Sequence, residues 1–383
     1  MPECKIFICT GFYLPGFKGG GPIRTIANMV DQLGNEFNFA LYTADRDLGD
    51  AAPYASIQRN AWQSVGKAEV FYASPEPGWI SNIASFEGNT IHLNSFFAFR
   101  FGILPLIFWR ILKPGAAIIL GPRGEFSEGA LNLKKRKKKF FISVAKTLGL
   151  YKNILWHASS DFEAADIRRV MGSNVKIHVA IDIASPKAEM TLKERWPGAP
   201  LRIVFVSRIS PKKNLLGAID ALKKIKSQVV FDIYGPAEDQ NYWAQCQESA
   251  KLLPQNIRFQ YCGALQPMQV PDKLAEYDLF FLPTLGENFG HVIAEALSSG
   301  LPVLISDTTP WRDLAEKSLG WDIPLNEVDR FAECIEACAA KSPEEYIQWR
   351  QSIRAWALKN IGNQDAIEQN RRLFLNLDSP HEH

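Results

Sequence analysis

Two carboxylates, Glu287 and Glu295, lie eight positions apart in a stretch that suits phosphate and hydroxyl recognition. The apolar run 279–283 before them is typical of a buried strand, and residues 290–299 predict a helix that ends at Gly300. Glu287 is then expected on the strand-to-helix loop and Glu295 within the helix. A helix N-terminus at the carboxyl edge of a parallel sheet favours a bound phosphate. From spacing alone, a polar loop followed by a helix with one surface Glu is an equally good interpretation.

A basic loop provides the matching cations. Arg208 and Lys213 follow the apolar run 202–206 and lie on a second strand-to-helix connection. A planar guanidinium and a compact ammonium can together bind two neighbouring phosphoryl groups. A solvated basic loop is the alternative interpretation.

Three consecutive glycines, Gly19, Gly20 and Gly21, follow the first predicted strand. Glycine lets the backbone approach a ligand closely, and the predicted helix behind it presents free N–H groups. The loop has neither the G-x-G-x-x-G pattern nor the Lys-Ser/Thr pair of a P-loop. Taken alone, it also fits a flexible surface turn.

Composition sets the frame for these loops. A length of 383 residues predicts two domains, and 46% hydrophobic with 22% charged residues fits a soluble globular protein. A net charge of +2 gives no electrostatic case for nucleic acid. The first ten residues predict a strand, not a signal peptide, and the apolar stretch 96–112 contains Arg100, Pro105 and Arg110, which argues against a membrane span. We therefore expect a cytoplasmic protein whose six cysteines are reduced thiols without a zinc site.

Apolar strands alternate with amphipathic helices, which predicts an α/β fold with parallel sheets. We predict strands at Lys5–Cys9, Phe37–Thr43, Glu69–Ala73, Thr90–Leu93, Ala116–Leu120, Ile154–Ala158, Lys176–Ile181, Arg202–Val206, Val229–Tyr234, Arg258–Cys262, Leu279–Leu282 and Val303–Ser306. We predict helices at Ile23–Leu33, Phe97–Leu112, Lys137–Leu148, from Asp161 behind a Ser160–Glu163 capping box, and through the tail 343–377. The Pro-containing stretch 184–200 is the predicted linker.

In this order and at these separations, Arg208-x(4)-Lys213, Glu287-x(7)-Glu295 and the three glycines resemble the retaining family-4 glycosyltransferases, the glycosyl transferases group 1. The resemblance covers nearly the whole chain. It implies the GT-B fold: two Rossmann-like domains with parallel sheets facing across a cleft, and C-terminal helices that return to the N-terminal domain. The expected parts are an acceptor-binding domain at 1–184, a nucleotide-sugar-binding domain at 185–355 and a returning helix at 356–383.

The resemblance also implies roles for single residues. Arg208 and Lys213 would bind the donor diphosphate and stabilise the leaving group, and Glu287 would hold the donor sugar as the third catalytic residue. The other implied donor-binding residues are Gly20, Gly21, Asn288, Phe289, Gly290, Glu295 and Gly263. No cofactor and no metal are expected, because the Arg and Lys neutralise the diphosphate. Transfer with retention would make Glu287 and Glu295 recognition groups and not a hydrolase-like acid–base pair.

The chain departs from the family pattern in both halves. Many relatives carry a His in a loop of the first domain, but here the loop 121–129 has none. Arg123 either takes its place or binds an acceptor phosphate; His92 is the other candidate, and a buried structural role is the alternative for it. Asn288 stands where a Gly is usual, and His291 occupies a position that is usually apolar. His291 is expected to cap the helix or to contact the sugar.

A run of six cations, Lys134, Lys135, Arg136, Lys137, Lys138 and Lys139, follows that loop. Cations near a membrane surface attract anionic lipid, and the neighbouring Phe140, Phe141 and Ile142 add apolar contact. A solvated helix face is the alternative, and no aromatic base-stacking platform accompanies the run to support nucleic-acid binding. We therefore expect docking on the cytoplasmic face of a membrane.

These patterns predict a retaining, metal-independent glycosyltransferase that uses a nucleotide-diphosphate sugar. The expected acceptor is a glycan or a lipid-linked sugar of cell-envelope polysaccharide biosynthesis, such as O-antigen, capsule or exopolysaccharide. Two alternatives remain open at this point. A GT-B epimerase would isomerise the nucleotide-sugar without an acceptor, and a non-catalytic glycan-binding module would not turn it over.

Overall fold

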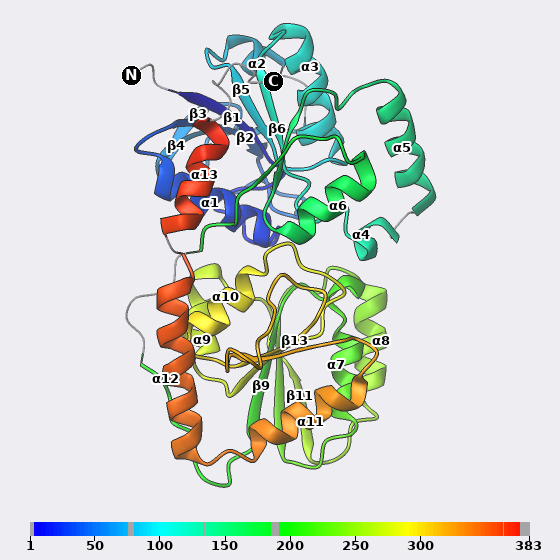
Figure 1. The fold of residues 1–383 in the computed structure, drawn as a ribbon, viewed down its shortest axis with the longest axis vertical. Helices are drawn as coiled ribbons and strands as arrows, with labels where there is room; N and C mark the ends of the chain where they lie inside the picture. The colour runs from blue at the N-terminus through cyan, green and yellow to red at the C-terminus, as the bar shows by residue number, and fades with distance from the viewer. Residues whose placement is uncertain (1–3, 76–79, 133–134, 185–190, 363, 376–383) are drawn as a thin grey trace. The chain divides into compact units, whose positions relative to one another are not determined.

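The computed structural model describes residues 4–75, 80–132, 135–184, 191–362 and 364–375. The chain divides into two compact units (Figure 1): the first comprises residues 1–183 together with 363–383, and the second comprises 184–362. The chain thus returns to the first unit at position 363 and not at 356. The difference arises because the long helix α12, Pro343–Asn360, continues on the second unit to its end.

The first unit is built on an eight-stranded sheet in the order β3-β4-β2-β1-β5-β6-β7-β8. Its strands are β1 Lys5–Cys9, β2 Asn38–Ala44, β3 Trp62–Val65, β4 Ala68–Ala73, β5 Thr90–Leu93, β6 Ala117–Leu120, β7 Leu155–Ala158 and β8 Ile177–Val179. All neighbouring strands are parallel except β3, which pairs antiparallel with β4. The chain order therefore reverses between β1 and β5, where an open sheet binds ligands beyond its carboxyl ends.

Helices cover this sheet, and one of them comes from the end of the chain. They are α1 Gly21–Leu33, α2 Ile80–Ser85, the π-helix Phe99–Ile103 with α3 Leu104–Leu112, α4 Glu128–Asn132, α5 Lys135–Thr147, α6 Asp161–Met171 and α13 Gln364–Leu375. Figure 1 shows α13 beside α1. Phe374 of α13 is buried against Phe37 and Phe39, and Arg371 forms a two-pronged ion pair with Glu36.

The second unit has a six-stranded, fully parallel sheet in the order β11-β10-β9-β12-β13-β14. Its strands are β9 Leu201–Val206, β10 Val229–Tyr234, β11 Ile257–Tyr261, β12 Leu279–Leu282, β13 Val303–Ser306 and β14 Gly320–Ile323. This is the doubly wound Rossmann order 3-2-1-4-5-6, and its reversal lies between β9 and β12. The strands β12, which is fully apolar, and β13, which is apolar up to Ser306, are buried along their whole length, as expected of central parallel strands.

The helices of the second unit pack in two groups. They are the 3₁₀ turn Pro211–Lys213, α7 Leu215–Leu222, α8 Gln240–Ala250, the 3₁₀ turn Pro267–Gln269, α9 Val270–Leu274, α10 His291–Ser298, α11 Val328–Ala339 and α12. Contacts join α7 to α8 and α11, and α10 to α9 and α12. The buried guanidinium of Arg350 in α12 donates to the carbonyls of Ala275, Ser299 and Gly300, at the C-terminal ends of α9 and α10. A cation at these ends complements both helix dipoles.

Sequence patterning missed two edge strands. β3 is half-exposed and alternates in burial, and β14 begins with a glycine, so neither shows a continuous apolar run. Half of the predicted capping box forms: the Ser160 hydroxyl accepts from the Glu163 N–H. The Glu163 carboxylate accepts from Ser159 and from the N–H of Gly124 instead. Among the described residues, no helix combines the length and the apolarity needed to cross a bilayer.

The packing of α13 yields a stability prediction. Phe374→Ala should lower the free energy of unfolding of the first unit by roughly 3–5 kcal/mol, because it leaves a cavity against Phe37 and Phe39. Leu375→Ala on the same helix removes a half-exposed side chain and should cost under about 0.5 kcal/mol. Urea unfolding of both variants measures the difference, and equal stability would show that α13 does not complete this core.

Candidate functional site

The candidate site lies at the strand-order reversal of the second unit. β9 and β12 are neighbours in the sheet, so the loops that follow them start from the same edge. The Asn214 side chain donates to the Pro283 carbonyl at 2.9 Å, and the N–H of Leu285 donates to the Lys212 carbonyl at 2.8 Å. These hydrogen bonds join the two loops, which are distant in sequence, into one surface.

Lys213 and Glu287 meet on this surface. The Lys213 ammonium forms an ion pair with the Glu287 carboxylate, and the two side chains are only 12% and 11% exposed. Burial acts to raise the pKa of the Glu287 carboxyl, but the charges of Lys213 and Lys212 outweigh it, so the pKa lies below its ordinary value. Glu287 is therefore an ionised hydrogen-bond acceptor at neutral pH and not a proton donor. The ammonium has three N–H donors, so one carboxylate leaves it capacity for phosphoryl oxygens.

Arg208 lies on the same loop after β9, but its side chain points to the loop that follows β10. Its guanidinium pairs at 3.1 Å with Glu238, which follows β10, and both side chains are partly exposed. The loops after three adjacent strands, β10, β9 and β12, thus each contribute a charged group. One carboxylate uses only part of the five-donor fork of Arg208.

The helix α10 begins beside the ion pair. Gly290 caps it in the left-handed region at φ 83°, and a Cβ there would lie 2.8 Å from the Ile293 side chain, so glycine is required. The Trp311 indole donates to the Phe289 carbonyl at 2.6 Å and fixes the turn. His291 is the first helical residue and is buried, with its ring 4.9 Å from that of Phe289. That packing explains how a His fits a position that is usually apolar.

The remaining predicted residues of the second unit lie around this helix start and along the same edge. Asn288 is half-buried on the loop, and Glu295 is half-buried one turn into α10. Gly263 follows β11 with φ 80°, and its carbonyl accepts from the N–H of Gly235. Within the residues that the structure describes, no group of three or more His, Cys, Asp or Glu gathers as metal ligands do.

The glycine loop belongs to the first unit. Gly20, at φ 73°, caps α1, and Gly21 is its first residue, so both lie beside the strand-order reversal between β1 and β5. The Asp47 carboxylate accepts from the N–H groups of Phe17 and Lys18, at 2.7 and 3.0 Å, and fixes the loop. The predicted helix N-terminus behind the glycines is therefore present.

Arg123 and His92 are internal residues, which corrects the sugar-contacting or acceptor-binding roles expected of them. His92 has no exposed surface, and the Arg123 side chain is 4% exposed. The guanidinium pairs with Asp182 at 3.3 Å and donates to Asn94 at 2.8 and 3.0 Å. It also contacts Nδ1 of His157 at 3.2 Å. Arg123 thus joins the carboxyl ends of β5, β7 and β8.

The partners of His157 fix its tautomer. A guanidinium can only donate, so Nδ1 of His157 accepts; the Ala180 carbonyl can only accept, so Nε2 donates to it. His92 then donates from Nε2 to the same Nδ1 at 3.3 Å. Burial, together with the charge of Arg123, lowers the pKa of both imidazoles well below the ordinary value. Both rings are therefore neutral.

The basic run forms the start of α5, except for Lys134, which lies outside the described residues. Lys135, Arg136, Lys137 and Lys139 are exposed. Lys138 turns inward, where its ammonium donates to the Ala130 carbonyl and lies 4.9 Å from the Phe97 ring centroid. Five of the six cations are thus described, and one of them is structural.

Sequence reasoning missed four residues that shape these sites. Asn214 sits in the left-handed region and caps α7, a role that a polar residue directly before the apolar stretch Leu215–Ala218 could have indicated. Trp311, His157 and Asp182 gave no signal, because each acts through contacts between segments that are distant in sequence.

The two neutral histidines make the first unit sensitive to acid. In the unfolded chain each imidazole takes up a proton near pH 6.5, whereas the folded unit holds it neutral to lower pH. Their stabilisation is full above about pH 6.5 and is lost as the pH falls below that value. We expect the free energy of unfolding to drop between pH 7 and 5, by about 1.4 kcal/mol per pH unit for each proton taken up. His157→Gln, measured by urea unfolding across this range, should reduce the slope; a flat wild-type profile contradicts the assignment.

Comparison with known proteins connects these sites to a family. Residues 187–356 match the family model "Glycosyl transferases group 1". The phosphatidyl-myo-inositol mannosyltransferase of Mycolicibacterium smegmatis is 27% identical over 185 residues, which are 46% of this chain and 46% of that protein. The match thus spans about half the length of this curated relative.

Solved structures match over the whole chain. The sucrose-phosphate synthase of Thermosynechococcus elongatus aligns with a TM-score of 0.73 at 14% identity, covering 98% of this chain and 99% of that one. HepE of Anabaena, solved in complex with UDP-glucose, aligns with a TM-score of 0.70 at 16% identity, covering 99% and 100%. At such identities the likeness shows the fold. Residues 187–356 thus match the glycosyl transferases group 1, and the chain has the GT-B fold, with two Rossmann-like domains.

Proposed function

We propose that this protein is a retaining glycosyltransferase that binds a nucleotide-diphosphate sugar on its second unit. The observation that carries the proposal is the Lys213–Glu287 pair at the carboxyl edge of β9 and β12, beside the α10 N-terminus. Ligands of doubly wound sheets bind at this edge. HepE, which shares the fold, was solved with UDP-glucose, so UDP-glucose is the first donor to test.

In this proposal the cations provide the catalytic electrostatics. Departure of a nucleoside diphosphate leaves negative charge on the phosphoryl oxygens, and fixed positive charge at that place lowers the barrier. Arg208 and Lys213 reach the edge from one loop, and each retains N–H donors beyond its carboxylate partner. The largely buried position of the Lys213 side chain strengthens the interaction, because less water screens it. The neutralising role therefore falls to the protein and not to a metal ion.

The carboxylates act as recognition groups. Glu287 is held ionised by two ammonium groups, which disfavours a role as general acid and suits acceptance of sugar hydroxyls. Its ion pair with Lys213 places the carboxylate assigned to the sugar next to the ammonium assigned to the leaving diphosphate. Glu295, one turn into α10, is assigned to the ribose hydroxyls. The backbone of Asn288, Phe289 and Gly290 is assigned to the donor sugar at the helix start.

For the acceptor we propose a glycan or a lipid-linked sugar of cell-envelope polysaccharide synthesis, met at an anionic membrane surface. The support is α5, which has four exposed cations in its first turns. Phe140 is 73% exposed on the same helix, and Val144, four residues later, and Leu148 beyond the helix end are also exposed. Spacing of four residues places Phe140 and Val144 on one face of α5, as in helices that lie in a membrane interface.

The donor assignment is tested by metal-free turnover. With excess EDTA, the protein should release nucleoside diphosphate from its nucleotide-sugar, and Lys213→Ala or Arg208→Ala should reduce kcat/KM by about 10²–10³. Lys213→Arg should recover part of the loss, whereas Lys226→Ala, an exposed lysine of the same unit, should match the wild type. Full activity in both alanine variants would exclude the assigned diphosphate site, and complete dependence on a divalent cation would exclude the metal-free proposal.

The membrane assignment is tested by co-flotation with vesicles of phosphatidylethanolamine and phosphatidylglycerol. Replacing Lys135, Arg136, Lys137 and Lys139 by Gln should weaken binding by about 4 kcal/mol, close to a thousand-fold, at about 1 kcal/mol per cation. A control with the same charge change replaces the exposed lysines Lys193, Lys224, Lys226 and Lys359. If the control loses as much affinity as the α5 variant, the attraction comes from net charge and not from α5.

A further inference from the structure

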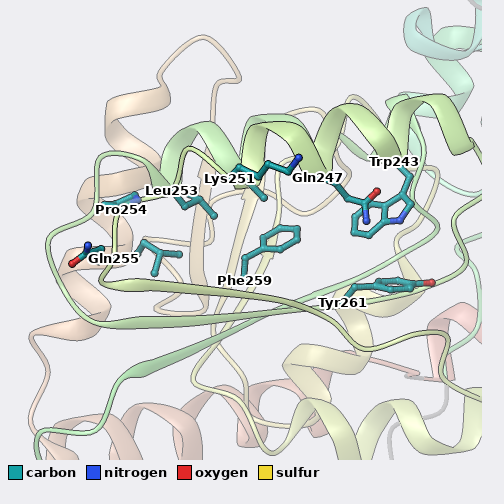
Figure 2. A pocket seen from close by; sticks show the side chains of 10 residues that line it. Trp243, Gln247, Lys251, Leu253, Pro254, Gln255, Phe259 and Tyr261 are labelled. Atoms are coloured by element: carbon teal, nitrogen blue, oxygen red, sulfur yellow. The ribbon is translucent and has the colours of Figure 1, made fainter.

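A second binding surface lies along the outer edge of the second unit. Figure 2 shows a groove between α8 and β11, the last strand of the sheet. Its volume is about 490 Å³, and it is broadly open to solvent. None of the proposed donor-binding residues lines it. We propose that this groove binds a neutral oligosaccharide.

Aromatic rings form one end of the groove. Tyr261 is 41% exposed, and its ring centroid lies 4.9 Å from that of Trp243, with the ring planes at 48°. Phe259 continues the aromatic wall, 6.4 Å from Trp243. An aromatic face carries negative charge density, so it attracts the weakly positive C–H groups of a sugar ring. The flat rings also bury sugar surface at small cost in side-chain entropy.

The polar groups of the groove match hydroxyls better than ions. Gln247 and Gln255 line it, and an amide both donates and accepts hydrogen bonds, as a sugar hydroxyl does. Lys251 is the one charged lining residue, and its ammonium is paired at 2.7 Å with Glu248. The lining thus offers two amides and a single cation that already faces a carboxylate, so it provides more hydrogen-bond partners for hydroxyls than for phosphate groups.

The groove is held in shape by hydrogen bonds around it. The Tyr261 hydroxyl donates to the Gly235 carbonyl at 3.0 Å, which fixes the ring. Asp239 caps the start of α8, and the Asn256 side chain donates to the carbonyls of Ile225 and Ser227 at the start of β11. A site already ordered before binding loses less entropy when its ligand arrives.

This assignment adds to the proposed function and does not depend on it. A glycosyltransferase with a separate oligosaccharide site retains a growing chain near its donor site, which raises the local acceptor concentration. The groove chemistry points to a neutral saccharide even if the donor assignment is wrong. The test must therefore measure oligosaccharide binding apart from turnover.

The test uses maltohexaose, cellohexaose and α-1,6-mannohexaose as probes, with saturation-transfer NMR and calorimetric titration of the full chain. At least one should bind. Tyr261→Ala should weaken it roughly ten-fold, as expected for loss of an aromatic anchor. Gln247→Ala should weaken it roughly five-fold through a lost hydrogen bond. Gln245→Ala, an exposed residue of the same helix outside the groove, should leave the affinity unchanged.

Several outcomes separate the explanations. Because Gln247 is an exposed helix residue, its variant keeps the test valid if Tyr261→Ala fails to fold. Lys213→Ala should keep oligosaccharide affinity while losing donor turnover, so the two proposals can fail independently. No binding of any probe, or equal affinity in the groove variants and the wild type, overturns the proposal. So does a dimer in analytical ultracentrifugation that Tyr261→Ala dissociates, because the groove would then be an interface between copies.

Discussion

The reversal of strand order between β9 and β12 is the constraint on which the candidate site depends. Adjacent parallel strands must end at the same edge, so the loops behind them face each other although they are distant in sequence. Two backbone-directed hydrogen bonds then hold those loops together and bring an ammonium against a carboxylate. The first unit repeats the arrangement between β1 and β5, where it places the glycine loop. The charged loops of the second unit and the glycine loop of the first unit thus both lie where the strand order reverses.

The sequence could predict these features because they rest on local signals. β12 was predicted to the residue, since four consecutive apolar residues followed by a proline leave little freedom. Charged residues on strand-to-helix loops indicated Arg208, Lys213 and Glu287, although not that the last two form a pair. Pairing depends on Asn214, whose left-handed backbone turns the loop toward its neighbour. Such a contact depends on which strands are neighbours in the sheet, and the order of residues in the sequence does not reveal it.

Arg123 shows why the rest could not be predicted. A cation on a strand-to-helix loop has the same appearance in sequence whether it faces solvent or the interior. In the folded chain, Glu163 accepts from the Gly124 N–H of this loop, and Asp182 forms an ion pair with Arg123. Asp182 also accepts from the Thr25 hydroxyl of α1, so the cation is directed inward. Burial requires compensating partners for such a charge, and Asn94, His157 and Asp182 provide them from three separate segments. The basic start of α5 is the opposite case, since most of its cations remain outside.

The helix α13 has a consequence for how the chain is made. Residues 364–375 supply Ala366, Leu373 and Phe374 to the core of the first unit, whose other buried apolar residues all precede position 184. A ribosome therefore synthesises the whole second unit before the first can be complete. During that interval the apolar surface around Phe37 and Phe39 lacks its cover, whereas the second unit can close on its own residues. The order of maturation is thus reversed with respect to the order of translation: the half that emerges first is completed last.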